Sequence, residues 1–133
     1  MDKVKLKALI VDDSEFSRQF TGVIINKIFA IDEAEDGLVA VEKHQQSVKL
    51  GTPYDIIFMD VIMPQMDGKK AVRQIREYEA SIGRGNIPII MISASEEIDD
   101  IENLVNGLLR KPASRPSLNE LLQSVFEGTV CLL

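Results

Sequence analysis

Residues 54–68 read YDIIFMDVIMPQMDG, and this stretch decides the fold class. Its first six residues are almost all apolar, which predicts a short strand buried on both faces. Asp60 follows that strand directly, and Asp67 is placed to cap a helix that we expect to run to about Ala80. The stretch therefore predicts a buried strand that delivers a carboxylate to a turn, followed by a helix.

Similar strand–helix units lie on both sides of this one. Strands are expected at residues 4–11, 29–34, 87–92 and 107–110, and helices at 14–28, from 37 onward, at 96–105 and at 117–126. In the first helix, apolar side chains recur at helical spacing and predict its buried face: Phe16, Phe20, Val23, Ile24 and Ile28. Five units with strands that are apolar on both faces indicate an open, doubly wound α/β fold, with a parallel sheet covered by helices on both sides.

Composition bounds the class of protein. The chain has 133 residues, and we expect residues 1–133 to form one domain. A formal net charge of −6 argues against nucleic acid or an anionic membrane as a direct partner, because both favour a basic surface. The lone Cys131 cannot form an internal disulfide bond, and no signal peptide or membrane span is recognisable. We expect a cytoplasmic protein or a soluble piece of a larger one.

Polar side chains follow the predicted strands at the points where they end. They are Asp12, Asp13, Asp60, Ser93 and Lys111. In open parallel sheets, ligands bind at the carboxyl ends of the strands, so we expect these side chains to converge. Three carboxylates about 5 Å apart repel by roughly 3 kcal/mol per pair at an effective dielectric constant near 20. A divalent cation would relieve that repulsion, and hard oxygen ligands suit Mg²⁺, with Mn²⁺ also possible.

This set of residues can support phosphoryl chemistry. A carboxylate beside Mg²⁺ can attack phosphorus and form an acyl phosphate. Lys111 would supply a compact cation for one phosphoryl oxygen, and Ser93 would supply a hydroxyl donor for another. The sequence therefore predicts a site that takes up and releases a phosphoryl group.

Four motifs carry a resemblance to a known family: ALIVDDS at 8–14, FMDVIMPQMDG at 58–68, MISAS at 91–95 and RKP at 110–112. In order and in strand context they resemble the receiver domain of two-component response regulators and hybrid histidine kinases. The resemblance covers nearly the whole chain. It implies a flavodoxin-like fold whose five-stranded parallel sheet has the order 2-1-3-4-5.

The resemblance also implies roles for single residues. Asp60 would be the phosphoacceptor, Asp13 a direct Mg²⁺ ligand, Asp12 a ligand acting mainly through water, the Ile62 backbone carbonyl a further ligand, Ser93 the switch hydroxyl and Lys111 the phosphoryl contact. A cis peptide bond before Pro112 would fit the family. The phosphodonor would be a phosphohistidine on a histidine kinase or a histidine phosphotransfer protein. The protein would not be an enzyme beyond its own phosphorylation and dephosphorylation, and a homodimer is possible.

The chain departs from the family in two respects. Leu108 stands where the family usually has an aromatic residue that moves with the switch hydroxyl. Ser93 and Lys111 are 18 positions apart, roughly four fewer than usual, or about one helical turn. We therefore expect a fourth helix that is short or partly irregular, and an altered partner surface.

Alternative interpretations stay open at this point. A pseudo-receiver would keep the fold as a binding module without productive phosphorylation. A phosphoaspartate hydrolase of the haloacid dehalogenase type would need a second acid where Ser14 stands, and a flavodoxin-like electron carrier would need a different loop after the first strand. Ser95 competes with Ser93 for the switch role. His44 is expected at the polar end of a helix without a phosphoryl role, and the apolar residues 130–133 have no assigned role.

Overall fold

The strands form one parallel sheet in the order β2-β1-β3-β4-β5, as predicted. The structure is a computed structural model, and it describes residues 5–126. The strands are β1 (Leu6–Val11), β2 (Phe29–Ala34), β3 (Ile56–Asp60), β4 (Ile89–Ser93) and β5 (Gly107–Arg110). Because β1 pairs with both β2 and β3, the strand order reverses beside β1, which is where open sheets of this kind bind ligands.

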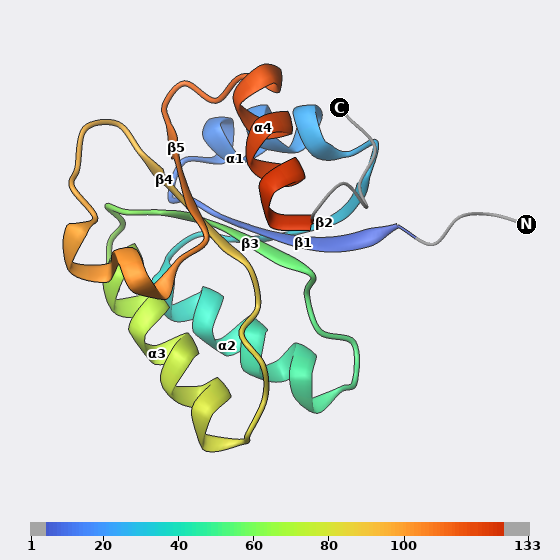
Figure 1. Cartoon of the computed structure of the whole chain (residues 1–133), viewed down its shortest axis with the longest axis vertical. Coiled ribbons are helices and arrows are strands. Elements are labelled where there is room, and N and C mark those ends of the chain that lie inside the picture. The colour runs from blue at the N-terminus through green and yellow to red at the C-terminus, as the bar shows by residue number, and fades with distance from the viewer. Residues whose placement is uncertain (1–4, 127–133) are drawn as a thin grey trace, which may run out of the picture.

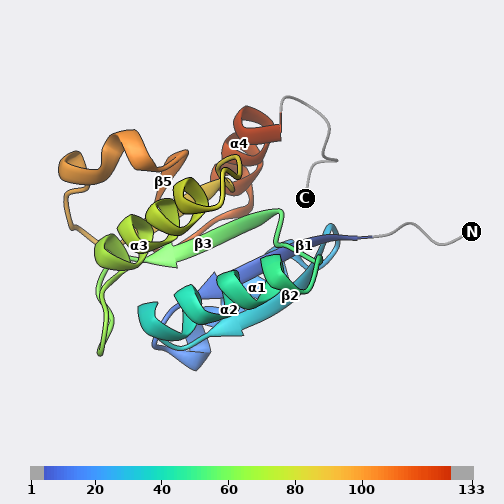
Figure 2. The same ribbon diagram turned by 90° about the horizontal axis from the view of Figure 1, so that it is seen from below.

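Two helices cover each face of the sheet. Helices α1 (Glu15–Ile25) and α4 (Arg115–Phe126) lie on one face, and α2 (Gly37–Lys49) and α3 (Gly68–Ser81) lie on the other (Figure 1). Turned by 90°, the molecule shows α2 and α3 running across the sheet on the near side (Figure 2). Alternate residues of β3 enter the two cores, with Ile57 and Met59 facing α2 and α3 and Phe58 facing α1 and α4.

Side-chain caps fix where the first three helices begin. Ser14, Asp36 and Asp67 each accept a hydrogen bond from a backbone N–H in the first turn of α1, α2 and α3. Such caps satisfy amide groups that have no partner inside the helix. The capping function expected for Asp67 is thereby confirmed, and Asp67 lies outside the acidic cluster that the structure forms.

The fourth helical segment is shorter than predicted and differs in kind. The sequence predicted a short helix over 96–105, whereas the structure has a 3₁₀ helix, η1 (Asp99–Leu104), of six residues without a side-chain cap. Its Asp100 lies 2.9 Å from Lys69 and 3.1 Å from Arg73 of α3, and Ile101 is fully buried. The expectation of a short, irregular segment is confirmed, and the predicted bounds were too wide. The ion pairs of Asp100 and the burial of Ile101 hold η1 against α3.

Two predictions about helix faces need correction. His44 is only 1% exposed, because the inward face of α2 runs through Ala40, His44 and Ser47 instead of ending before His44. On α1, Ile24 is buried and Ile28 packs against the core, as predicted, but Phe16 is 76% exposed, Val23 64% and Phe20 45%. Both errors arise because several apolar stripes fit the same helix, and packing against the sheet selects only one.

Within residues 5–126, no helix has both the length and the apolar composition needed to cross a lipid bilayer. Cys131 and the apolar residues 130–133 lie outside the described residues.

Candidate functional site

The ends of β1 and β3 bring three carboxylates together, as predicted. Asp12 and Asp60 are 2% and 4% exposed, whereas Asp13 is exposed to solvent. One ligand oxygen from each of the three residues lies within 4.8 Å of the other two. The parallel pairing of β1 with β3 places Val11 beside Met59, so the residues that follow them meet at the same edge of the sheet.

Lys111 reaches into this cluster from the end of β5. Its Nζ atom lies 3.2 Å from Oδ2 of Asp12 and 3.3 Å from Oδ2 of Asp60. Its backbone N–H donates to the carbonyl of Ser93 at 2.9 Å, and the Lys111–Pro112 peptide bond is cis, as the resemblance implied. Burial acts to lower the pKa of Lys111, but the charges of Asp60 and Asp12 outweigh the effect of burial. The pKa is raised above its usual value, so the ammonium stays charged.

The electrostatics of Asp60 indicate that negative charge in the cluster exceeds the single positive charge of Lys111. Burial, and then the charge of Asp12, raise the pKa of Asp60 to about 6, although Lys111 and the backbone N–H of Val61 act to lower it. Three carboxylates and one ammonium, −3 + 1, leave a formal charge of −2. Carboxylate oxygens at this spacing with that charge suit a divalent cation of the hard, oxygen-preferring type. The donor set therefore fits the metal that the sequence predicted.

The loop after β3 folds back onto the strand that carries Asp60. The Gly68 N–H donates to the Val61 carbonyl at 2.7 Å, and a Cβ atom at Gly68 would lie only 2.0 Å from the Asp60 carbonyl oxygen. Glycine is thus required at the start of α3 for close approach of two backbones. Ile62 lies in this loop with its side chain 64% exposed, and the part expected for its carbonyl stays a prediction.

Ser93 is fully buried beside the cluster, and two residues hold its hydroxyl. The Ser93 Oγ donates to the Glu96 carbonyl at 3.0 Å and lies 3.3 Å from the Glu96 carboxylate. Arg110 Nη1 donates to the Ser93 Oγ at 3.3 Å and to the Glu96 carbonyl at 3.2 Å. Ser95, by contrast, is exposed, and its backbone N–H donates to the Glu96 carboxylate at 2.7 Å. The position of Ser93 fits the switch role better than that of Ser95.

Leu108 lies on β5 beside Met91 of β4. It is half-buried and packs against the apolar core on the α2 and α3 side of the sheet. A leucine therefore occupies the position where an aromatic residue was expected from the family, and its part in switching stays a prediction.

Sequence reasoning missed three residues around the site. Arg18, Glu96 and Arg110 contact the Asp12 carbonyl or the Ser93 hydroxyl, although none of them was assigned a role at the site. Only Arg110 carried a signal, because it directly precedes Lys111 at a strand end. The contacts of Arg18 and Glu96 depend on how separate elements meet, which sequence spacing does not encode.

Comparison with known proteins agrees with this geometry. Residues 8–123 match the family model of the response regulator receiver domain. The chain is a receiver domain. It belongs to the response regulator receiver family of two-component signalling, and the hydrolase and electron-carrier alternatives are thereby replaced.

Receiver relatives include both small proteins and segments of long ones. The chemotaxis protein CheY of Halobacterium salinarum is 32% identical over 125 residues, which are 90% of this chain and 96% of that protein. Probable histidine kinase 2 of Oryza sativa subsp. indica is 32% identical over 137 residues, covering 92% of this chain. This receiver domain spans only 13% of the length of that kinase.

Solved receiver structures share the fold. A chain of the CheX–CheY–BeF₃–Mg²⁺ complex from Borrelia burgdorferi is 31% identical with a TM-score of 0.75, over 91% of this chain and 89% of that one. The receiver domain of the histidine kinase CKI1 from Arabidopsis thaliana, complexed with Mg²⁺ and BeF₃⁻, is 29% identical with a TM-score of 0.72, over 92% and 88%.

Proposed function

We propose that this receiver domain takes a phosphoryl group onto Asp60 from a phosphohistidine on a histidine kinase or a histidine phosphotransfer protein. One observation carries the proposal: the buried Asp60 carboxylate shares a 4.8 Å cluster with Asp12 and Asp13 and contacts Lys111 at 3.3 Å. An Oδ atom of Asp60 forms the bond to phosphorus while the bond between phosphorus and the donor imidazole nitrogen breaks. The imidazole leaves with the electron pair and takes up a proton.

Asp12, Asp13, Asp60 and the Ile62 carbonyl would hold Mg²⁺, and Mn²⁺ would suit the same oxygen ligands. When bound, the cation would neutralise charge on the phosphoryl oxygens. The receiver relatives solved with Mg²⁺ and beryllofluoride support this proposal. A sheet edge with a formal charge of −2 also supports it, because that charge repels a phosphoryl group until a cation is present.

The other side chains would act on the phosphoryl oxygens. Lys111 would leave its contact with Asp60 and bind one phosphoryl oxygen instead. Ser93 would turn its hydroxyl away from the Glu96 carbonyl and donate to a second phosphoryl oxygen. In the later hydrolysis step, a water oxygen would bond to phosphorus as the bond between phosphorus and the Asp60 oxygen breaks, which releases inorganic phosphate and returns a free carboxylate. In this proposal, the protein catalyses only its own phosphorylation and dephosphorylation.

An apolar groove beside the site supports a protein as the phosphodonor. A cavity of about 310 Å³ is lined by Asp12 and Lys111 of the site and by Phe16, Phe20 and Pro112. Phe16 is 76% exposed, which is unusual for a large aromatic side chain without a partner. A partner helix that covers this groove would bring its histidine close to Asp60, since Asp12 and Lys111 line the cavity and also lie beside the Asp60 carboxylate.

Other parts of the proposal concern the setting of the domain. We infer that residues 1–133 work as one receiver unit in the cytoplasm, where histidine kinases deliver phosphoryl groups. The short η1 segment and Leu108 would alter the surface that contacts output partners. Those partners would therefore differ from the partners of receivers with a full fourth helix. A homodimer stays a prediction.

The decisive experiment is phosphorylation with acetyl phosphate and Mg²⁺, read by intact mass. Wild type should gain one phosphoryl group, and Asp60→Asn should gain none. Asp67→Asn is the matched control, because Asp67 is an exposed carboxylate of the same loop that caps α3. A wild-type protein that gains no phosphate, beside a receiver that does, would identify a pseudo-receiver.

A further inference from the structure

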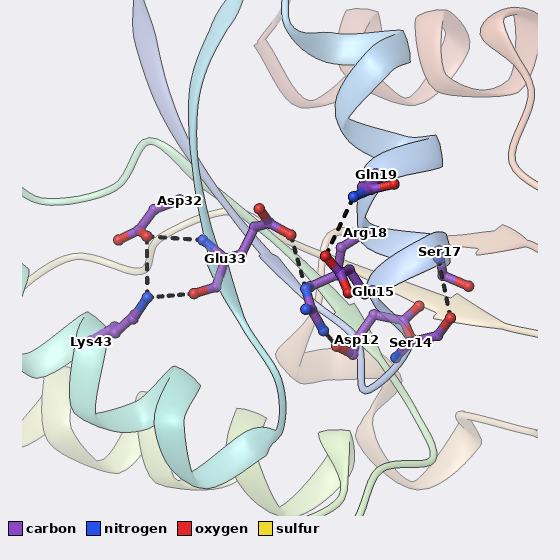
Figure 3. Close-up of polar contacts among 9 residues, drawn as sticks. All are labelled: Asp12, Ser14, Glu15, Ser17, Arg18, Gln19, Asp32, Glu33 and Lys43. Carbon is purple, nitrogen blue, oxygen red and sulfur yellow. Dashed lines mark hydrogen bonds and ion pairs between the residues drawn. The ribbon is translucent and has the colours of Figure 1, made fainter.

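Arg18 of α1 joins the loop that carries the acidic pair to strand β2. Its Nη1 atom donates to the backbone carbonyl of Asp12 at 2.7 Å, and its Nε atom donates to Oε1 of Glu33 at 2.8 Å (Figure 3). The Arg18 side chain is only 16% exposed, so the guanidinium is held between the two elements. Neither Arg18 nor Glu33 belongs to the acidic cluster itself.

The atom that Arg18 contacts is significant. The Asp12 carbonyl belongs to the planar peptide unit that links Asp12 to Asp13, so fixing this oxygen orients the backbone from which both carboxylates leave. Two further bonds act on the same turn: the Asp12 N–H donates to the Ala34 carbonyl at 3.1 Å, and the Ser14 N–H donates to Oδ1 of Asp12 at 2.9 Å. Arg18 completes this set from outside the turn.

We infer that Arg18, held by Glu33, is a positioning residue for the divalent-cation site of Asp12 and Asp13. This inference rests on the proposed function, since it assumes that these carboxylates hold Mg²⁺. A guanidinium suits the task because its planar fork donates in two fixed directions at once. Residues that orient metal ligands from outside the ligand set commonly change metal affinity by about 10- to 100-fold when they are removed.

Electrostatics and positioning predict opposite results for the loss of Arg18. A cation beside the cluster repels Mg²⁺, so the loss of its charge alone would tighten Mg²⁺ binding. The loss of its hydrogen bond would instead free the peptide between Asp12 and Asp13 and weaken binding. The sign of the change therefore separates the two effects without any reference to phosphorylation.

Lys43 of α2 provides a matched control on the same surface. Its Nζ atom lies 3.1 Å from Oδ1 of Asp32 and donates to the backbone carbonyl of Glu33 (Figure 3). Like Arg18, it is a cation that contacts β2, but the hydrogen bonds and ion pairs of its side chain are to β2 and not to the turn at Asp12. Lys43→Ala removes one positive charge while leaving that turn intact.

The test is calorimetric titration of the full chain with MgCl₂, on wild type, Arg18→Ala, Arg18→Lys and Lys43→Ala. We expect Arg18→Ala to raise the Mg²⁺ Kd about 10-fold, which is the lower end of the range for residues that orient metal ligands. Arg18→Lys keeps the charge but loses the fork, so its Kd should rise by about three-fold. Lys43→Ala should stay within about two-fold of wild type.

Thermal unfolding in EDTA, followed by circular dichroism, establishes that each variant is folded at the titration temperature. A merely structural Arg18 would lower the unfolding midpoint and leave the Mg²⁺ Kd of the folded protein unchanged. If Arg18→Ala is folded, an unchanged or lower Mg²⁺ Kd would overturn the inference. If Arg18→Ala does not fold, an unchanged Mg²⁺ Kd for Arg18→Lys would overturn it instead. If wild type itself binds no Mg²⁺, the proposed metal site fails, which is a separate outcome.

Discussion

Gly68 lies so close to Asp60 that a Cβ atom at residue 68 would come within 2.0 Å of the Asp60 carbonyl oxygen. The backbone N–H of Gly68 also donates to the Val61 carbonyl at 2.7 Å. The first turn of α3 is thus packed directly on the end of β3. The loop between them is closed by this contact, and the position of the Asp60 backbone depends on a residue without a side chain.

Gly68→Ala should therefore disturb both the fold and the site. The added methyl group must displace the backbone of Asp60 or of α3, and overpacking of this kind costs about 1–3 kcal/mol. Gly85→Ala is the matched control, because a Cβ atom there meets nothing within 4 Å. We expect urea unfolding, followed by circular dichroism, to give a clearly lower midpoint for Gly68→Ala alone. Equal midpoints for the two variants would contradict the close approach.

The fold class and the acidic cluster could be predicted from local patterns, whereas the strand order was implied by the resemblance to receiver domains. A strand that is apolar on both faces must lie inside a covered parallel sheet, and the end of each such strand lies at one edge. Because β1 and β3 are neighbours, Asp12, Asp13 and Asp60 converge. Strand β2 has its predicted bounds, although only its two end residues are buried.

What could not be predicted depends on which of several competing contacts forms. His44 was expected at the polar end of α2, but the packing of α2 against α3 continues one turn further and buries it. The contact of Arg18 with Asp12 requires α1, β1 and β2 to meet at particular distances, which no spacing in the chain specifies. Side-chain directions of this kind follow from tertiary packing rather than from local propensity.

Asp60→Asn should stabilise the metal-free protein at neutral pH. The folded-state pKa of Asp60 is about 6, against 3.8 for an ordinary aspartate, because burial and Asp12 disfavour its charge. As pH rises, the unfolded chain therefore loses this proton at a lower pH than the folded protein does. The unfolding free energy of the wild type falls between about pH 4 and pH 6 and stays at the lower value above pH 6. The asparagine has no charge to bury, so its advantage at pH 7.5 should be up to about 2–3 kcal/mol.

Urea unfolding in EDTA at pH 7.5 and pH 4 provides the measurement for this pair of proteins. The difference in unfolding free energy between Asp60→Asn and wild type should be largest at pH 7.5 and small at pH 4. Saturating Mg²⁺ at pH 7.5 should stabilise wild type more than the variant, because a ligand that binds only the folded state adds to its stability. A difference that grows toward low pH would show that Asp60 has no raised pKa.

Glu96→Ala should make the domain easier to activate. The Ser93 hydroxyl lies 3.3 Å from the Glu96 carboxylate, which alanine removes, and 3.0 Å from the Glu96 backbone carbonyl, which alanine keeps. Losing the carboxylate contact should free the hydroxyl to turn and tighten beryllofluoride binding in Mg²⁺ by up to roughly five-fold, which corresponds to about 1 kcal/mol for one hydrogen bond. NMR titration measures the affinity directly.

Two controls separate the hydroxyl from simple charge removal. Glu97→Ala removes an exposed carboxylate next in the chain and should change the affinity much less. In a Ser93→Ala background, Glu96→Ala should lose most of its effect, since coupled residues do not act additively. An equal gain with and without the Ser93 hydroxyl would show that Glu96 acts by charge alone.

His44→Leu should stabilise the protein and leave its phosphorylation unchanged. Among the described residues, neither ring nitrogen of the buried His44 has a hydrogen-bond partner, and its Nε2 atom lies 4.0 Å from Oε2 of Glu79. Burial lowers the pKa of His44 below 6.5, although Glu79 acts to raise it. The unfolded chain therefore takes up the proton more readily, and wild-type stability should fall as pH drops below about 6.5.

Leucine has no ring nitrogens that need a hydrogen-bond partner, and it has no group that takes up a proton as the pH falls. At pH 7 we expect the variant to gain about 1 kcal/mol in unfolding free energy, and its advantage should grow toward pH 5. Gln46→Leu, an apolar replacement on the exposed face of the same helix, should show no such pH dependence. Acetyl phosphate should label His44→Leu to the same extent as wild type. A loss of labelling would make the buried imidazole part of the phosphoryl pathway, at the end of the sheet away from Asp60.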